Sequence, residues 1–175
     1  ITRVVCTPDI DKGELEIVVD TAGPASGVFL TTPDGSGQYG AGKPGAPFRV
    51  KIPDAKLWTP ETPHLNTIGI GVWAKRDDEP VEIVQTYYAK RKISAAKDEH
   101  GVLRLMLNNK PVFQYGPLDQ GWWPDGLLTP PSDEAMRYDL EVLKRLGFNM
   151  LRKHIKVEPA RLYHHCDKMG LLVWQ

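Results

Sequence analysis

The chain has 175 residues, of which 41% are hydrophobic and 25% charged, a composition typical of an ordinary soluble globular protein. Its 22 basic residues balance its 22 acidic residues, so no net charge favours nucleic acid or an anionic membrane surface as a partner. No apolar stretch approaches the length of about 20 residues that a membrane-spanning helix needs, so we expect no membrane span.

The two cysteines, Cys6 and Cys166, lie far apart in the sequence and show no spacing typical of zinc ligands. We therefore expect two small buried side chains, no disulfide framework and no metal site. No charged and then apolar leader begins at Ile1, and the compartment stays open, with a periplasmic or extracellular location favoured over the cytoplasm.

From residue 1 to 96, short segments rich in β-branched and aromatic residues alternate with turn-forming sequences. Within "ELEIVVD", the residues Leu15, Ile17 and Val19 alternate with largely polar neighbours, which is typical of a strand with one buried face. The number and spacing of these segments predict an all-β immunoglobulin-like sandwich of about 100 residues. The other predicted strands lie in "SGVFLTT", "PFRVKIP", "LNTIGIGVWAK" and "VEIVQTYYAKRKI".

A glycine-rich stretch, "PDGSGQYGAGKPGAP", occupies residues 33–47. It lacks the lysine and hydroxyl residue that end a phosphate-binding loop, and no helix follows it. We therefore expect a plain loop here.

After "KDEHG" the pattern changes to alternating strands and helices. "VLRLMLNNKPVFQYG" predicts two short strands joined through Asn108 and Asn109, residue types that tolerate positive φ. "PSDEAMRYDLEVLKRLG" predicts a helix with Ser132 as its N-cap and Gly147 as its terminator. A strand in "FNMLR", a helix in "EPARLYHHCDKMG" and a strand in "LLVW" follow, which predicts right-handed βαβ units with a parallel sheet.

Both predicted helices carry an apolar stripe that should face a core. The stripe members are Met136, Leu140, Leu143 and Leu146 in the first helix, and Leu162, Cys166 and Met169 in the second.

The motifs "LNNKPVFQYG", "DLEVLKRLGFNMLRKH" and "LYHHCDKMGLLVWQ" resemble the entrance of the catalytic barrel of glycoside hydrolase family 2, the family of β-galactosidases, β-glucuronidases and β-mannosidases. Asn109 stands where the family usually has glycine. "LWTPETPHLNTI" and "YYAKRKI" resemble segments of the sandwich domain that precedes this barrel. The resemblance covers residues 56–175 and implies an immunoglobulin-like sandwich over residues 1–97, followed by the truncated N-terminal part of a (β/α)8 barrel over residues 98–175.

The activity that the resemblance implies is that of a retaining glycosidase acting on O-glycosidic bonds, with a β-galactoside-type substrate and no cofactor. Such enzymes use two carboxylates about 5 to 5.5 Å apart. In the family, both catalytic glutamates follow later barrel strands, and no residue of this chain matches either. We therefore expect no catalytic residue among these 175 and no glycosidase activity from the chain alone.

The residues that can contact a sugar are expected in two loops, because barrel sites lie at the carboxyl ends of the strands. The flat faces of tryptophan suit the C–H side of a pyranose, and polar side chains suit its hydroxyls. Our candidates for substrate binding are Asp119, Trp122, Trp123 and Asp125 in "GPLDQGWWPDGLLTPP", and Arg152 and His154 in "RKHIKVEP".

Simpler roles stay open for several of these residues. Trp122 or Trp123 can plug the barrel mouth, and Asp125 can belong to a turn. The resemblance implies that Arg152 orients catalytic carboxylates from later strands. In the second loop we expect Lys153 to be a solvated lysine and Glu158 a helix N-cap.

Two other expectations concern the whole chain. A non-catalytic carbohydrate-binding module, or a purely structural sandwich, is the alternative to a glycosidase. The strand at residues 171–174 would have an unpaired edge and an uncovered face, which predicts self-association of the chain through it.

Overall fold

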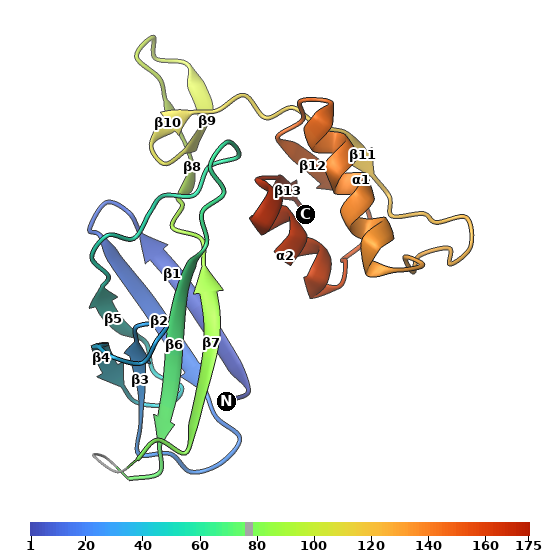
Figure 1. Ribbon diagram of the computed structural model, residues 1–175. Coiled ribbons are helices and arrows are strands. Elements are labelled where there is room, and N and C mark those ends of the chain that lie inside the picture. The colour runs from blue at the N-terminus through green and yellow to red at the C-terminus, as the bar shows by residue number, and fades with distance from the viewer. Residues whose placement is uncertain (76–78) are drawn as a thin grey trace. The chain divides into compact units, whose positions relative to one another are not determined.

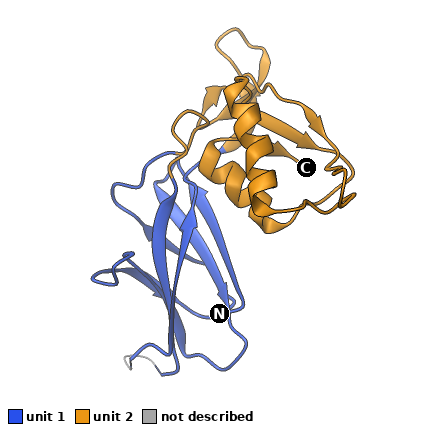
Figure 2. Ribbon diagram, turned by 45° about the vertical axis from the view of Figure 1, so that its right-hand side comes forward, with its two compact units in different colours: residues 1–57, 65–92 blue, residues 58–64, 93–175 orange. Residues whose placement is uncertain are grey.

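A computed structural model describes residues 1–75 and 79–175, and the chain divides into two compact units (Figure 2). The first unit contains residues 1–57 and 65–92, and the second contains residues 58–64 and 93–175. The first unit therefore ends at residue 92, whereas the boundary predicted from the sequence lies after residue 97. The difference arises because the strand at residues 93–97 pairs with a strand of the second unit.

Within its described residues, the first unit contains seven strands, whose arrangement can be followed in Figure 1. They are β1 (Arg3–Asp9), β2 (Glu14–Asp20), β3 (Gly27–Thr31), β4 (Gln38–Gly42), β5 (Phe48–Lys51), β6 (Asn66–Trp73) and β7 (Glu82–Tyr88). They make two antiparallel sheets, with strand orders β1-β2-β5 and β4-β3-β6-β7.

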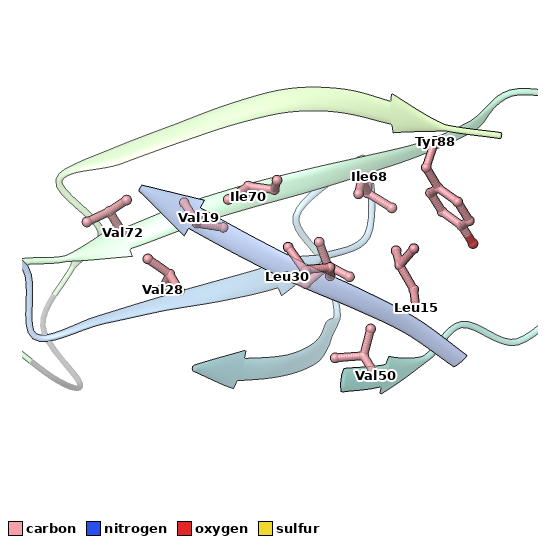
Figure 3. Packing of buried hydrophobic residues seen from close by; sticks show 10 residues of the cluster. Leu15, Val19, Val28, Leu30, Val50, Ile68, Ile70, Val72 and Tyr88 are labelled. Carbon is pink, nitrogen blue, oxygen red and sulfur yellow. The ribbon is translucent and has the colours of Figure 1, made fainter. Parts of the chain in front are cut away.

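The two sheets share one hydrophobic core, so the first unit is a two-layer β-sandwich (Figure 3). Leu15, Ile17 and Val19 of β2 are buried, which confirms the inward face predicted from their alternation. The other buried members of this core are Val28, Leu30, Val50, Ile68, Ile70, Val72 and Tyr88.

The glycine-rich stretch differs from its prediction, because part of it forms the edge strand β4. This strand pairs with β3 in antiparallel register. A Cβ atom at Gly40 would lie 2.6 Å from Cγ1 of Val50, and one at Gly42 would overlap the ring of Phe48. The glycines thus let β4 pass close to β5, and the loop prediction was wrong here because it weighed composition without these packing partners.

The second unit begins with an antiparallel sheet in the order β10-β9-β8. Its strands are β8 (Ile93–Lys97), β9 (Leu103–Leu107) and β10 (Lys110–Pro111). Asn108 and Asn109 join β9 to β10 with φ values of 52° and 65°, which confirms the predicted tight hairpin turn.

A parallel sheet with two helices follows (Figure 1). The elements are β11 (Leu118–Asp119), α1 (Asp133–Arg145), β12 (Met150–Lys153), α2 (Ala160–Met169) and β13 (Leu172–Trp174). Strand β12 lies between β11 and β13 and is parallel to both, as the βαβ prediction requires. Strand β11 lies within "GPLDQGWWPDGLLTPP", a stretch predicted to be a loop.

The helix signals in the sequence are largely confirmed. The Ser132 hydroxyl accepts a hydrogen bond from the Ala135 N–H and caps α1, and Gly170 ends α2 in the left-handed conformation. The stripe residues pack together with Leu151 of β12 in a second core. Leu146 is the exception, because it is the C-cap of α1 and 65% exposed.

The segment 58–64 belongs to the second unit although the first unit flanks it in sequence. Trp58 is fully buried, and its indole N–H donates to the Asp167 carbonyl at 2.7 Å. The ammonium of Lys144 donates to the carbonyls of Pro60 and Gly170. The segment therefore joins the carboxyl ends of α1 and α2. Within the described part of the chain, neither α1 nor α2 is long and apolar enough to cross a membrane.

Candidate functional site

The two loops that carry the predicted site residues follow the carboxyl ends of β11 and β12. These strands are neighbours in the parallel sheet, with Asp119 opposite Lys153 in register. Side chains from both loops therefore meet at one edge of the sheet.

The centre of this edge is a group of buried charges. The Lys153 side chain is only 1% exposed, and its ammonium lies 2.7 Å from Asp119 Oδ2 and 2.6 Å from Glu158 Oε1. Glu158 is also buried, with a side chain that is 3% exposed. The expectations of a solvated Lys153 and of Glu158 as a helix N-cap were wrong, since Pro159 is the residue that precedes α2.

A second lysine connects these charges to the first loop. Lys156 pairs with Glu158 at 3.1 Å. Its ammonium also donates to the carbonyls of Gly121 and Leu128, at 3.1 and 2.6 Å. The backbone of the first loop is therefore fixed on both sides of the two tryptophans.

Asp119 is held in a defined orientation at the end of β11. One carboxylate oxygen accepts the Gly121 N–H at 2.7 Å, and the other faces Lys153. The side chain remains about one third exposed, so it is the member of the charged group that can still reach a ligand.

The two tryptophans of the first loop have different surroundings. Trp122 is 63% exposed, whereas Trp123 packs against the second core. The backbones of Trp123 and Leu127 bond to each other, so the exposed Asp125 lies in the turn between them. Trp122 therefore offers the open ring face, while Trp123 supports the loop from beneath.

Arg152 and His154 lie on the other side of the sheet from Lys153, because side chains alternate along a strand. Arg152 is exposed, and His154 Nδ1 lies 3.4 Å from the Gln120 amide nitrogen. Four of the six candidate residues thus form two groups: Asp119 and Trp122 on the side of the helices, and Arg152 and His154 on the opposite face.

A cleft of about 650 Å³ adjoins the first group. It is lined by residues 117–122 and by four residues of α1: Tyr138, Asp139, Val142 and Leu143. Burial raises the pKa of the Asp139 carboxyl, and the Asp119 charge raises it further, while Lys153 acts in the opposite direction. The cleft combines open aromatic faces with carboxylates, which is the pairing that a sugar ring and its hydroxyls need.

The residues that sequence reasoning missed are Lys153, Lys156 and Glu158. One signal was available for Lys153, which stands two positions after Leu151 and hence on the same inward face of the strand. For Lys156 and Glu158 we find no such local signal, because Lys156 binds carbonyls of the first loop and Gly121 of that loop lies against Glu158. Among the residues described, no group of three or more histidine, cysteine and acidic side chains has the arrangement of a metal site.

Comparisons with known proteins find relatives that carry glycosidase names. No family model matches the chain. A protein of Formosa agariphila, provisionally named a β-glucuronidase, is 29% identical over 98% of this chain and 17% of its own length. A β-galactosidase of Vibrio cholerae is 31% identical over 67% of this chain and 11% of its own length. The chain thus spans less than a fifth of the length of these curated relatives.

Solved structures share the fold over nearly all of the chain. A β-galacturonidase of glycoside hydrolase family 2 from Eisenbergiella tayi has a TM-score of 0.72 and 20% identity, and covers 99% of this chain with 32% of its own. A β-glucuronidase from Ruminococcus gnavus has a TM-score of 0.73 and 16% identity, and covers 97% of this chain with 28% of its own.

Proposed function

We propose that this chain, which belongs to glycoside hydrolase family 2, forms part of an enzyme that hydrolyses O-glycosidic bonds. The observation that carries the proposal is the agreement between two kinds of relative. Curated relatives with glycosidase names match in sequence, and solved glycosidases of this family match in fold along the whole chain. On this proposal, the first unit is the immunoglobulin-like sandwich and the second unit contains the first strands of a (β/α)8 barrel.

The substrate that we propose is a β-glycoside of a hexopyranose. A β-galactoside is the substrate expected from the family resemblance, and the relatives are named as enzymes of β-galactosides, β-glucuronides and β-galacturonides. The sugar ring in each of these has an apolar C–H face and several hydroxyls. An exposed tryptophan beside carboxylates can contact both.

In the proposed enzyme, each residue of the site has its own role. Trp122 stacks on the sugar ring, and Asp119 accepts hydrogen bonds from its hydroxyls. Trp123 and Asp125 shape the loop that carries Trp122. Arg152 and His154, on the opposite face of the sheet, face the catalytic carboxylates that later strands of the barrel supply, so the 175-residue chain by itself binds sugar without hydrolysing it.

The test is a binding measurement on the chain as it is. Methyl β-galactoside and methyl β-glucuronide would be titrated separately, with saturation-transfer NMR as the readout. Trp122→Ala should weaken binding about five-fold or more, because stacking on an aromatic ring contributes on the order of 1 kcal/mol or more. Trp73→Ala, in the sandwich, is the control and should leave binding unchanged.

Failure of the chain to bind either glycoside would contradict the proposal, and so would either of two other results. Binding that Trp73→Ala abolishes and Trp122→Ala spares would favour a carbohydrate-binding sandwich instead. Release of nitrophenol from nitrophenyl glycosides by the purified chain would contradict the assignment of catalysis to later strands.

A further inference from the structure

Lys153 carries a positive charge inside the second unit, on the side of β12 that faces the helices. Leu151, two residues earlier on the same face, packs in the second core. A lysine is rarely buried in this way unless partners offset the cost of removing its ammonium from water. The two carboxylates within 2.7 Å of the Lys153 ammonium are those partners.

The charges in this group are balanced and closely packed. Lys153 and Lys156 offset Asp119 and Glu158, so the group has no net charge. Gly121 lies against it with φ of 68°, and a Cβ atom there would be 2.6 Å from Glu158 Oε1 and 2.7 Å from Lys156 Nζ. The loop backbone therefore rests directly on the charged side chains.

Stability alone does not explain why charges occupy this place. Replacing a buried ion pair by apolar side chains of similar size is often neutral or even stabilising. The charges instead fix the orientation of side chains. Lys153 orients Asp119 and Glu158, and Glu158 orients Lys156. Lys156 then holds the carbonyls of Gly121 and Leu128.

We propose that Lys153 is a positioning residue for the sugar-binding loop, acting through Asp119, Glu158 and Lys156 to hold the backbone that carries Trp122. The nature of the ligand rests on the proposed function, whereas the positioning role of Lys153 rests on the contacts described above. Lys153 itself touches no sugar, because its side chain is enclosed.

The experiment uses the 175-residue chain labelled with 5-fluorotryptophan, whose fluorine resonances are assigned by single Trp→Phe replacements. In Lys153→Met, which retains the length of the side chain and removes the charge, the resonances of Trp122 and Trp123 should shift or broaden. The resonance of Trp73, in the other unit, should stay in place. Lys12→Met, which removes a surface pair with Asp9, is the matched control and should change neither tryptophan of the loop.

The second readout is the dissociation constant for methyl β-galactoside and methyl β-glucuronide. Lys153→Met should raise it about five-fold, the factor expected when Trp122 no longer stacks on the sugar ring. Glu158→Gln, which keeps the shape and removes the charge, should give the same two changes and covers the case in which Lys153→Met does not fold.

The outcomes separate the two ideas. Unchanged resonances of Trp122 and Trp123 in Lys153→Met would overturn the positioning role, whatever the sugar measurement gives. Unfolding of both variants would also overturn it, because the charges would then be needed for the fold. If the unmodified chain binds neither glycoside, the proposed function fails while the fluorine spectra still decide the positioning role.

Discussion

Three glycines of the chain differ in backbone conformation and in what a Cβ atom would contact. Together they separate the cost of left-handed backbone strain from the cost of a steric collision. Gly170 has φ of 78°, and a Cβ atom there would overlap the carbonyl of Pro60. Gly147 has φ of 85° with open space around it, and Gly23 has open space and no positive φ.

We expect Gly170→Ala to lower the free energy of unfolding by more than about 2 kcal/mol, since it combines left-handed strain with a collision against backbone. Gly147→Ala should lower it by about 1 kcal/mol, and Gly23→Ala by less than about 0.5 kcal/mol. Urea unfolding measures all three. Equal effects at Gly170 and Gly147 would show that the contact with Pro60 is absent.

Two aspartates of α1 should respond to pH in opposite directions. The hydrogen bond with His165 lowers the pKa of Asp133, so its contribution to stability exists above the ordinary pKa of 3.8 and is lost as pH falls through the lower folded value. Burial and then the Asp119 charge raise the pKa of Asp139, so stability decreases as pH rises from below 3.8 through the higher folded value.

At pH 7 we therefore expect Asp139→Asn to raise the unfolding midpoint and Asp133→Asn to lower it. Both differences should shrink when the pH falls far enough to protonate the carboxylates. Thermal unfolding midpoints measured from pH 2 to 7 test this, because that range includes the ordinary aspartate pKa of 3.8. A decrease for Asp139→Asn at pH 7 would contradict the assigned environment.

At the scale of elements, α1 is predictable from local sequence signals. Its cap, its acidic first turn and its basic last turn are all readable from the sequence, and the structure confirms them. The hairpin at Asn108 and Asn109 is readable for the same reason, because positive φ is a local requirement. Strand β4 is not readable, since its glycines are explained only by close contacts with β5.

The cap of α1 gives a prediction about this element. Ser132→Ala should lower the free energy of unfolding by about 1 kcal/mol, because the Ala135 N–H loses its acceptor. Ser132→Asp keeps an acceptor at the same position and should restore most of the loss. Chemical unfolding monitored by far-ultraviolet circular dichroism measures both variants, and an equal loss in both would exclude the cap as the cause.

On the scale of the whole molecule, the two units are not consecutive in sequence, because residues 58–64 belong to the second unit. The predicted domain of residues 1–97 would therefore keep this segment while losing its partners. Trp58 would lose the acceptor at Asp167, and Pro60 would lose its contact with Lys144.

We expect a chain that ends at residue 97 to expose Trp58. Its tryptophan emission should shift to longer wavelength and become open to quenching by acrylamide, relative to the full chain carrying Trp122→Phe, Trp123→Phe and Trp174→Phe. A version with Trp58→Phe isolates the remaining Trp73 and serves as the control. If Trp58 stays shielded from acrylamide in the shorter chain, its burial does not depend on residues 98–175.

The sequence by itself determined the strands of alternating pattern, the two helices with their terminal signals, and the family resemblance, because these depend on neighbours a few residues apart. It also named Asp119 and Trp122, which the structure places beside one cleft. Only the tertiary structure decided that Lys153 and Glu158 are enclosed as partners of each other and that Lys156 holds the carbonyls of Gly121 and Leu128. The reason is physical: whether a charge is solvated or enclosed depends on side chains that folding brings together from distant positions.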